Sequence, residues 1–193
     1  ARLMRATENI RFQRGQSDRF KEGVIRSGYY LKHIEKILAE EGVPDFVKFL
    51  PHVESSFQEY AISKFAAAGL WQLMPATGRM FLRVEYVIDE RLDPWVATRA
   101  AARHLKRDFK ALGAWPLALT AYNHGPGGVM RAVKSLGTSD IAEIAFNYES
   151  PSFGFASRNF YAQFLAAVEV ASNYKRYYGE LPVKKPIEFE VAK

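Results

Sequence analysis

The sequence has no cysteine among its 193 residues. A disulfide framework and any metal site built on thiolates are therefore excluded, while an oxidising compartment is allowed. Histidine is also scarce, and the four that occur do not have the spacing of HExxH or a similar metal-ligand motif. We therefore expect neither a metal ion nor a cofactor.

Long apolar runs are missing as well. The most apolar window, FAAAGLWQLMPA, is short and is interrupted by Gln72, so we expect no transmembrane segment. The start of the chain has no apolar core of a signal peptide; if the natural product is exported, that peptide has been removed. A lipid anchor, or an additional wall-binding domain in the full-length protein, is compatible with both absences.

Acidic residues are outnumbered by basic ones, 21 against 27, which gives a net charge of +6. Such an excess favours polyanionic partners, namely nucleic acid, anionic lipid or an acidic wall polymer. The basic residues are scattered along helical segments, as at Arg99, Arg103 and Arg107, and no nucleic-acid-binding motif is present. We interpret them as a solvated face and expect no nucleic-acid partner.

Helical periodicity punctuated by proline and glycine runs through most of the chain. The clearest helix has Asp93 as its N-cap, Pro94 as its first residue and Gly113 just past its end. Further helical patterns end at Gly42 and cover residues 157–179. The sequence therefore predicts a mainly helical, all-α domain.

The segment from residue 44 to about residue 57 raises a question about an acid. Its apolar side chains recur at i, i+4, i+7 and i+11, which predicts one buried helical stripe: Phe46, Leu50, Val53 and Phe57. Pro51 must kink or end this helix. Glu54 sits at the edge of the stripe, so we expect its carboxyl group to be half-buried and its pKa raised by apolar neighbours and the helix dipole.

Two further motifs mix polar and apolar side chains. In SKFAAAGLWQLMPATG, residues 63–78, the aromatic ring of Trp71, the thioether of Met74 and the amide of Gln72 suit a sugar, although Trp71 and Met74 also fit a core. In LTAYNHGPGG, residues 119–128, Tyr122 and Asn123 precede a glycine-rich turn. That turn indicates either a ligand site or an ordinary helix C-cap, and it lacks the phosphate-loop spacing.

The three segments VESSF, AAGLWQLMPATG and AYNHGPGG, in this order, resemble the soluble lytic transglycosylase family, whose catalytic domain is similar to goose-type lysozyme. The resemblance covers most of residues 25–175. Within the family, the chain is most similar to the membrane-bound type D branch, in which tryptophan often stands at the position of Trp71. The resemblance implies a lysozyme-like fold.

The resemblance also implies roles for individual residues. Glu54 matches the family's single catalytic acid and base, and Ser55 its usual partner. Four positions match residues that contact the sugar at or beside the scissile bond: Ser63, Gln72, Met74 and Tyr122. Asn123 belongs to the same motif as Tyr122. The chain departs from the family at one place. Phe160 stands where a tyrosine is usual, so Tyr161 either substitutes from the next position or the hydroxyl is absent.

A single carboxylate is unusual for a glycosidase, which ordinarily uses two acids unless the substrate assists. No second acid has a clear claim here, since Asp93 is explained by capping, and Asp89 and Glu90 by a solvated turn. In the mechanism we infer, Glu54 protonates the glycosidic oxygen and then accepts a proton from the C6 hydroxyl of N-acetylmuramic acid, which gives a 1,6-anhydro product.

The expected function is therefore peptidoglycan lytic transglycosylase, acting on glycan strands as an exported, periplasmic or envelope-associated monomer. Two alternatives stay open, a lysozyme-type hydrolase acting on normal or de-N-acetylated strands and a noncatalytic glycan-binding module. We expect a helical extension over residues 1–24, a catalytic domain over residues 25–179 and an extended arm over residues 180–193. The arm would lead to a wall-binding or other domain.

Overall fold

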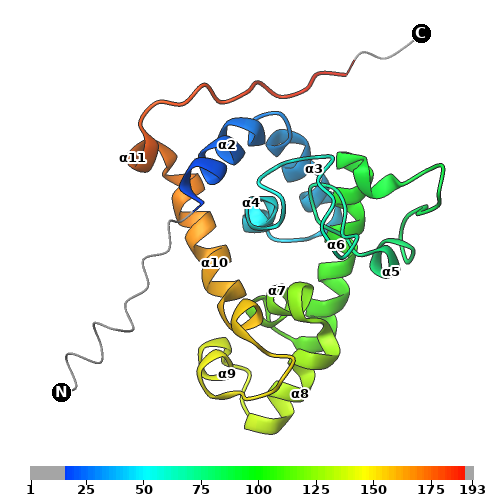
Figure 1. Ribbon diagram of the computed structural model, residues 1–193, viewed down its shortest axis with the longest axis vertical. Coiled ribbons are helices and arrows are strands. Elements are labelled where there is room, and N and C mark those ends of the chain that lie inside the picture. The colour runs from blue at the N-terminus through cyan, green and yellow to red at the C-terminus, as the bar shows by residue number, and fades with distance from the viewer. Residues whose placement is uncertain (1–15, 190–193) are drawn as a thin grey trace.

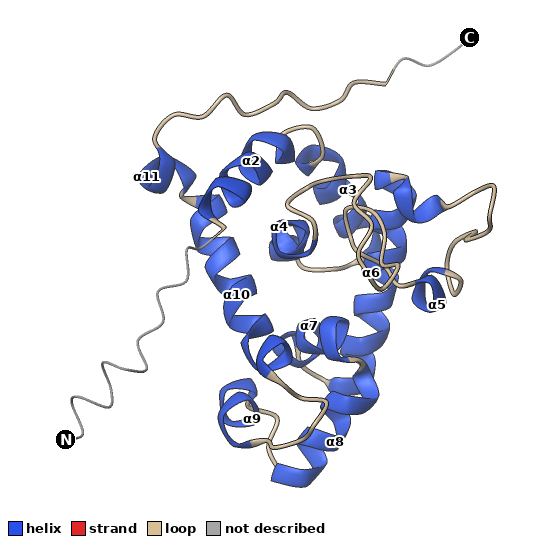
Figure 2. Ribbon diagram, viewed as in Figure 1, coloured by secondary structure: helices blue, strands red, loops and turns tan. Residues whose placement is uncertain are grey.

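The computed structural model describes residues 16–189, and helices dominate this part of the chain (Figure 1). The elements in chain order are α2 (Ser17–Ser27), α3 (Leu31–Glu41), the 3-10 helix η1 (Asp45–Phe49), α4 (Leu50–Glu54), α5 (Pro75–Gly78), the 3-10 helix η2 (Glu90–Leu92), α6 (Pro94–Leu112), α7 (Trp115–His124), α8 (Pro126–Leu136), α9 (Ile141–Asn147), α10 (Phe155–Ser172) and α11 (Tyr174–Tyr178). Among residues 16–189, strand pairing is limited to three isolated bridges (Figure 2). The predicted all-α class is confirmed.

Helix α6 forms as its sequence predicts. The carboxylate of Asp93 accepts hydrogen bonds from the backbone N–H groups of Trp95 and Val96, Pro94 occupies the first turn, and Gly113 ends the helix with φ of +77°. Its buried face is rich in alanine, with Ala97, Ala100 and Ala101 almost inaccessible. Small side chains let this long helix pack closely against α3 and α7.

The helix expected from residue 44 to about residue 57 is wrong in its extent. The chain instead forms η1 and then α4, with Pro51 in the first turn of α4, where its missing N–H costs nothing. Helix α4 ends at Glu54, and Ser56 and Phe57 have positive φ values. Leu50 and Phe57 are fully buried as predicted, but Phe46 is partly exposed, because the stripe is broken by these two changes of backbone.

Helix α4 lies near the middle of a ring formed by α2, α3, α6, α7 and α10 (Figure 1). The main core surrounds it and includes Ile34, Leu38, Leu50, Phe57, Trp71 and Leu105. A smaller core joins α7, α8 and α9 and contains Leu117, Val129, Ile144 and Phe153. The acid predicted from the sequence is therefore carried by a short helix at the centre of the molecule.

The C-terminal helical segment divides at Asn173 into α10 and α11 and ends at Gly179, as its glycine predicts. Beyond it, the arm continues without a strand and lies against the body. The backbone N–H of Lys184 donates to the carbonyl of Ile25, and that of Ile187 donates to the carbonyl of Tyr29. Most of the expected N-terminal extension, residues 1–15, lies outside the described residues. The last residues of the arm, 190–193 with Val191, also lie outside them.

None of the helices within residues 16–189 combines the length and the apolar character needed to cross a membrane.

Candidate active site

Glu54 lines a hollow of about 300 Å³, which we call the Glu54 hollow. The other lining residues come from the wall segment, which is residues 61–74, and from the end of α7: Ser63, Phe65, Ala67, Gln72, Met74, Tyr122 and Asn123. Three stretches that are distant in sequence therefore meet around one carboxyl group. The structure brings together six of the residues selected from the sequence, and Phe65 and Ala67 join them.

Glu54 is the last residue of α4, and its side chain is half-buried. Its carboxyl group makes no hydrogen bond or ion pair with any other residue in the range 16–189 that would stabilise its charge. Loss of water around the group raises its pKa to about 8. At neutral pH the carboxyl group therefore holds its proton, as a general acid must.

Ser55 lies behind the Glu54 hollow and not in its wall. The residue is buried, and its hydroxyl donates a hydrogen bond of 2.8 Å to the carbonyl oxygen of Leu70. This bond ties the end of α4 to the wall segment.

The wall segment is held in a compact loop by its own polar side chains. The hydroxyl oxygen of Ser63 accepts hydrogen bonds from the backbone N–H groups of Phe65 and Ala67. The amide nitrogen of Gln72 donates to the carbonyl oxygens of Ala61 and Gly69. The hydroxyl hydrogen of Ser63 and the amide oxygen of Gln72 are then left for a ligand in the hollow.

Trp71 and Met74 lie in different environments. The Trp71 side chain is fully buried, and its indole N–H donates to the hydroxyl of Thr98 at 2.8 Å, so this ring belongs to the core. Met74 is exposed and lines the Glu54 hollow. Phe65, which the sequence analysis did not select, is 81% exposed at the same hollow. Its position two residues after Ser63 in the same motif is a signal that could have identified it.

Tyr122 reaches the hollow from the last turn of α7. Its hydroxyl donates to the carbonyl oxygen of Trp71 at 2.7 Å. Burial, and after it the negative charges of Glu54 and Asp108, hold the pKa of Tyr122 well above its usual value, so the phenol stays neutral. Asn123 lies beside it, and its amide oxygen accepts a hydrogen bond from the hydroxyl of Ser157 on α10.

Tyr161 is not brought to the Glu54 hollow. It lines a separate hollow of about 510 Å³ between α9 and α10, together with Phe146 and Leu165. Phe160, at the family position of the tyrosine, is buried in the main core. The step of about 100° between neighbouring helical residues accounts for the two different directions.

A second hollow of about 790 Å³ also reaches Glu54. It is bounded by residues from four helices, α2, α4, α10 and α11, among them Ser17, Arg19, Gln163 and Tyr178. Glu54 therefore lines both hollows. Within residues 16–189, no group of three or more histidine or acidic side chains is placed to hold a metal ion.

Comparison with known proteins identifies the family and the fold of this chain. Residues 33–145 match the family model described as the transglycosylase SLT domain. The chain is 32% identical over 160 residues to membrane-bound lytic murein transglycosylase D of Escherichia coli strain K12, a match that covers 82% of this chain and 35% of that protein. The chain thus spans about a third of the length of this curated relative.

Two solved structures share the fold. An inactive glutamate-to-glutamine mutant of the lytic transglycosylase Slt of Pseudomonas aeruginosa superposes with a TM-score of 0.59 at 23% identity, covering 80% of this chain and 25% of that one. The 70 kDa soluble lytic transglycosylase of Escherichia coli gives a TM-score of 0.59 at 22% identity with the same coverage. The lysozyme-like fold expected from the sequence is confirmed.

Proposed function

This chain belongs to the transglycosylase SLT domain family, and from that premise we propose that it is a peptidoglycan lytic transglycosylase. Its substrate would be the β-1,4 bond between N-acetylmuramic acid and N-acetylglucosamine. The observation that carries the proposal is the neutral carboxyl group of Glu54, a residue that lines two hollows. A polymer needs room on both sides of the bond to be cleaved, and the two hollows supply it.

In the first step, Glu54 gives its proton to the glycosidic oxygen as the bond from that oxygen to C1 of N-acetylmuramic acid breaks. The raised pKa keeps the acid protonated at neutral pH, where a solvated glutamate with a pKa of about 4.3 is almost wholly ionised. No carboxylate nucleophile lines the Glu54 hollow among the described residues. The acetamido oxygen of the same sugar would instead form the bond to C1.

In the second step, the carboxylate left on Glu54 takes the proton from the C6 hydroxyl of the same sugar. The C6 oxygen bonds to C1 and displaces the acetamido oxygen, which closes a 1,6-anhydro ring. Glu54 is protonated again, and no water is consumed. One carboxyl group is sufficient because it changes roles within a single turnover.

The wall residues would hold the sugar for this chemistry. Ser63 has a hydroxyl hydrogen to donate and Gln72 an amide oxygen to accept, while Phe65 and Met74 offer apolar surface to the face of a pyranose ring. Tyr122 stays neutral and accepts through its phenolic oxygen. Ser55 would act by fixing Glu54 against the wall segment, and Asn123 by its place at the edge of the hollow.

The proposed location is the cell envelope, because the relative of Escherichia coli is named as membrane-bound and the basic surface favours an anionic wall. We assign the proposed activity to a catalytic unit over residues 25–179, acting as a monomer, to which residues 16–20 add part of the lining of the second hollow. Residues 180–189 do not line either hollow at Glu54. The arm would therefore connect this unit to another part of the protein without taking part in catalysis.

The decisive experiment digests purified sacculi with the wild type and with Glu54→Gln, and weighs the released muropeptides. We expect wild-type products one water lighter than hydrolytic ones, and a rate lowered at least about 100-fold in Glu54→Gln. Glu143→Gln is the matched control, because Glu143 is exposed on α9 and lines neither hollow at Glu54. Full-weight reducing ends would instead show a lysozyme-type hydrolase, and intact sacculi with retained glycan binding a noncatalytic module.

A further inference from the structure

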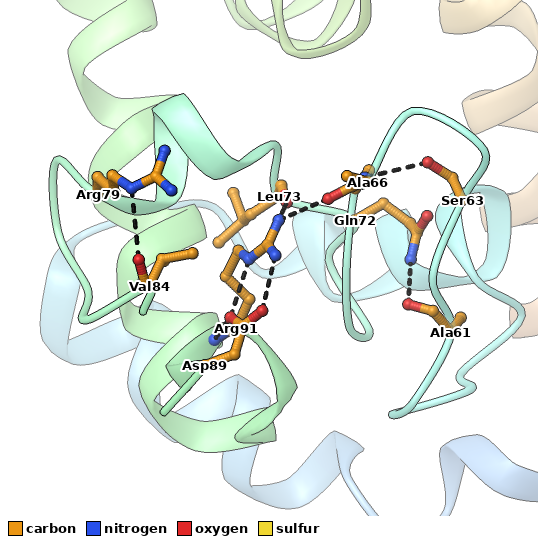
Figure 3. Close-up of polar contacts among 10 residues, drawn as sticks. Ala61, Ser63, Ala66, Gln72, Leu73, Arg79, Val84, Asp89 and Arg91 are labelled. Carbon is orange, nitrogen blue, oxygen red and sulfur yellow. Dashed lines mark hydrogen bonds and ion pairs between the residues drawn. The ribbon is translucent and has the colours of Figure 1, made fainter. Parts of the chain in front are cut away.

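Arg91 is a buried cation outside both hollows at Glu54. Its side chain is 8% exposed. The guanidinium donates through one terminal nitrogen to two carbonyl oxygens, that of Ala66 at 2.6 Å and that of Leu73 at 2.9 Å (Figure 3). Both carbonyls belong to the wall segment, so one side chain binds this loop at two points.

The remaining bonds of Arg91 go to Asp89. The pair is bidentate, with Nε donating to one carboxylate oxygen at 2.9 Å and the second terminal nitrogen donating to the other at 2.6 Å (Figure 3). The same carboxylate also accepts from the backbone N–H of Arg91. These bonds lower the pKa of Asp89, which stays ionised and holds the guanidinium plane in one orientation.

The loop that Arg91 binds is strained where the bonds are made. Ala66 has φ of +62° and Gln72, directly before Leu73, has φ of +47°. Each of these left-handed conformations costs a residue other than glycine on the order of 1 kcal/mol. Gly69 has φ of +79° and lies against the backbone carbonyl of Arg91, so closely that no Cβ would fit. Ser63 and Gln72 owe their positions in the hollow to this loop conformation.

We propose that Arg91, held by Asp89, is a positioning residue that keeps the wall segment in the conformation that places Ser63 and Gln72 against the sugar. This inference rests on the proposed function for its effect on turnover. Arg91 does not itself line the Glu54 hollow; it acts through the two loop carbonyls. Glu54 is tied to the wall separately, by Ser55.

The test replaces Arg91 by lysine, which keeps the charge but cannot bind two carbonyls and a bidentate carboxylate at once. On soluble glycan strands at 25 °C we expect kcat/KM to fall at least about 10-fold, with the alkaline limb of the pH profile unchanged because Glu54 is untouched. Arg99→Lys is the matched control. Arg99 also pairs with acids, Glu40 and Glu41, but on the surface, and we expect no change.

A double-mutant cycle separates positioning from general stability. If Arg91 acts through Gln72, then adding Gln72→Ala to Arg91→Lys costs no further kcat/KM beyond the larger single loss. A merely structural role predicts a lowered melting temperature with wild-type kcat/KM for the folded enzyme, and this result would overturn the proposal. Should Arg91→Lys not fold, Asp89→Asn loosens the same fork more gently and is measured in the same way.

Amide hydrogen exchange measures how firmly Arg91 holds the wall segment, and it requires no turnover. We expect Ser63, Ala68 and Leu73, whose N–H groups close the loop, to exchange at least about 10-fold faster in Arg91→Lys, while the amides of α6 keep their rates. If the wild type leaves sacculi intact, the proposed function fails, but the exchange rates still test whether Arg91 holds the wall segment. Unchanged exchange in the loop would overturn the positioning role whatever the activity.

Discussion

The neutral carboxyl group of Glu54 has an unusual neighbour in His52. Burial, and after it the charge of Arg26, lowers the pKa of His52 to about 3, and the ring stacks on Phe20 with centroids 4.8 Å apart. Both titratable side chains at the end of α4 are therefore uncharged at neutral pH. Glu54 is the one of the two whose ionisation falls near the working range of an enzyme.

The pH dependence of activity follows from this. Because the acid must start protonated, we expect the initial rate of sacculus clearance to fall as pH rises through about 8, the pKa of Glu54. Below that limb we expect a plateau down to the onset of acid unfolding, because no second catalytic carboxylate has to ionise. The measurement is the initial rate between pH 4 and 10, with circular dichroism at each pH to confirm folding. An alkaline limb near pH 4.5 would contradict the burial of the acid.

Individual site residues could be predicted from the sequence where they belong to a motif. The sequence predicts site roles for Glu54, Ser63, Gln72, Met74 and the Tyr122 motif, and these residues line one hollow. Arg91 was not selected, because a buried arginine in the sequence DERLD looks the same as a solvated one. Its partners, the carbonyls of Ala66 and Leu73, are backbone atoms that no sequence pattern displays. Asp89 was assigned to a solvated turn, and the structure corrects this to an ion pair with Arg91.

At the scale of elements, the contact between the wall segment and α6 includes a buried hydrogen bond between two side chains. The indole N–H of Trp71 donates to the hydroxyl of Thr98, which itself donates to the carbonyl of Pro94. Since both side chains are fully buried, water cannot replace a lost partner. The bond therefore fixes the wall segment to the longest helix of the fold.

We expect Thr98→Val to lower the free energy of unfolding by about 1 to 3 kcal/mol, because the indole N–H is left without an acceptor. Thr120→Val is the matched control. Thr120 is also fully buried and donates to the carbonyl four residues before it, Pro116, but within residues 16–189 it accepts no hydrogen bond from another side chain. Its loss should be under about 1 kcal/mol. Urea unfolding followed by circular dichroism measures both, and equal losses would refute the role given to the indole bond.

Elements were predictable where caps and periodicity agree, and not elsewhere. Asp93, Pro94 and Gly113 marked both ends of α6 because each residue has a local preference for its position. The segment at residues 44–57 showed a helical stripe that the backbone interrupts twice. Its hydrophobic spacing was real, since Leu50 and Phe57 are buried, but burial at Phe57 is achieved by a turn. Tertiary packing overrode the periodicity there.

At the scale of the whole molecule, the arm packs on α2, α3 and the start of α6. The ring of Phe189 packs edge-on against His33 and Trp95, and Ile187 packs on the main core. A ring nitrogen of His33 lies 2.7 Å from the carbonyl oxygen of Ile187. The extended character of the arm was predictable from its prolines, whereas its docking site on α2 and α3 was not.

Removing residues 181–193 should therefore cost stability and leave catalysis intact. We expect the free energy of unfolding to fall by about 1 to 3 kcal/mol, from the lost apolar contacts of Ile187 and Phe189. Phe189→Ala should show part of this loss, and Phe146→Ala none, because Phe146 is 82% exposed. Thermal unfolding checks the stability, and kcat on glycan strands should stay within about 3-fold of wild type. A truncated protein of unchanged stability would rule out the docking.

The place of α4 has a consequence for the substrate. This helix is short, packs against α2, η1 and α10, and is bonded to the wall segment through Ser55, so the backbone at Glu54 is held from several sides. Under the proposed function, the saccharide would then have to adapt to the acid: its pyranose ring would flatten and its linkage would rotate toward a proton donor whose backbone stays in place. In the Michaelis complex, the carbohydrate would change its conformation more than the protein does.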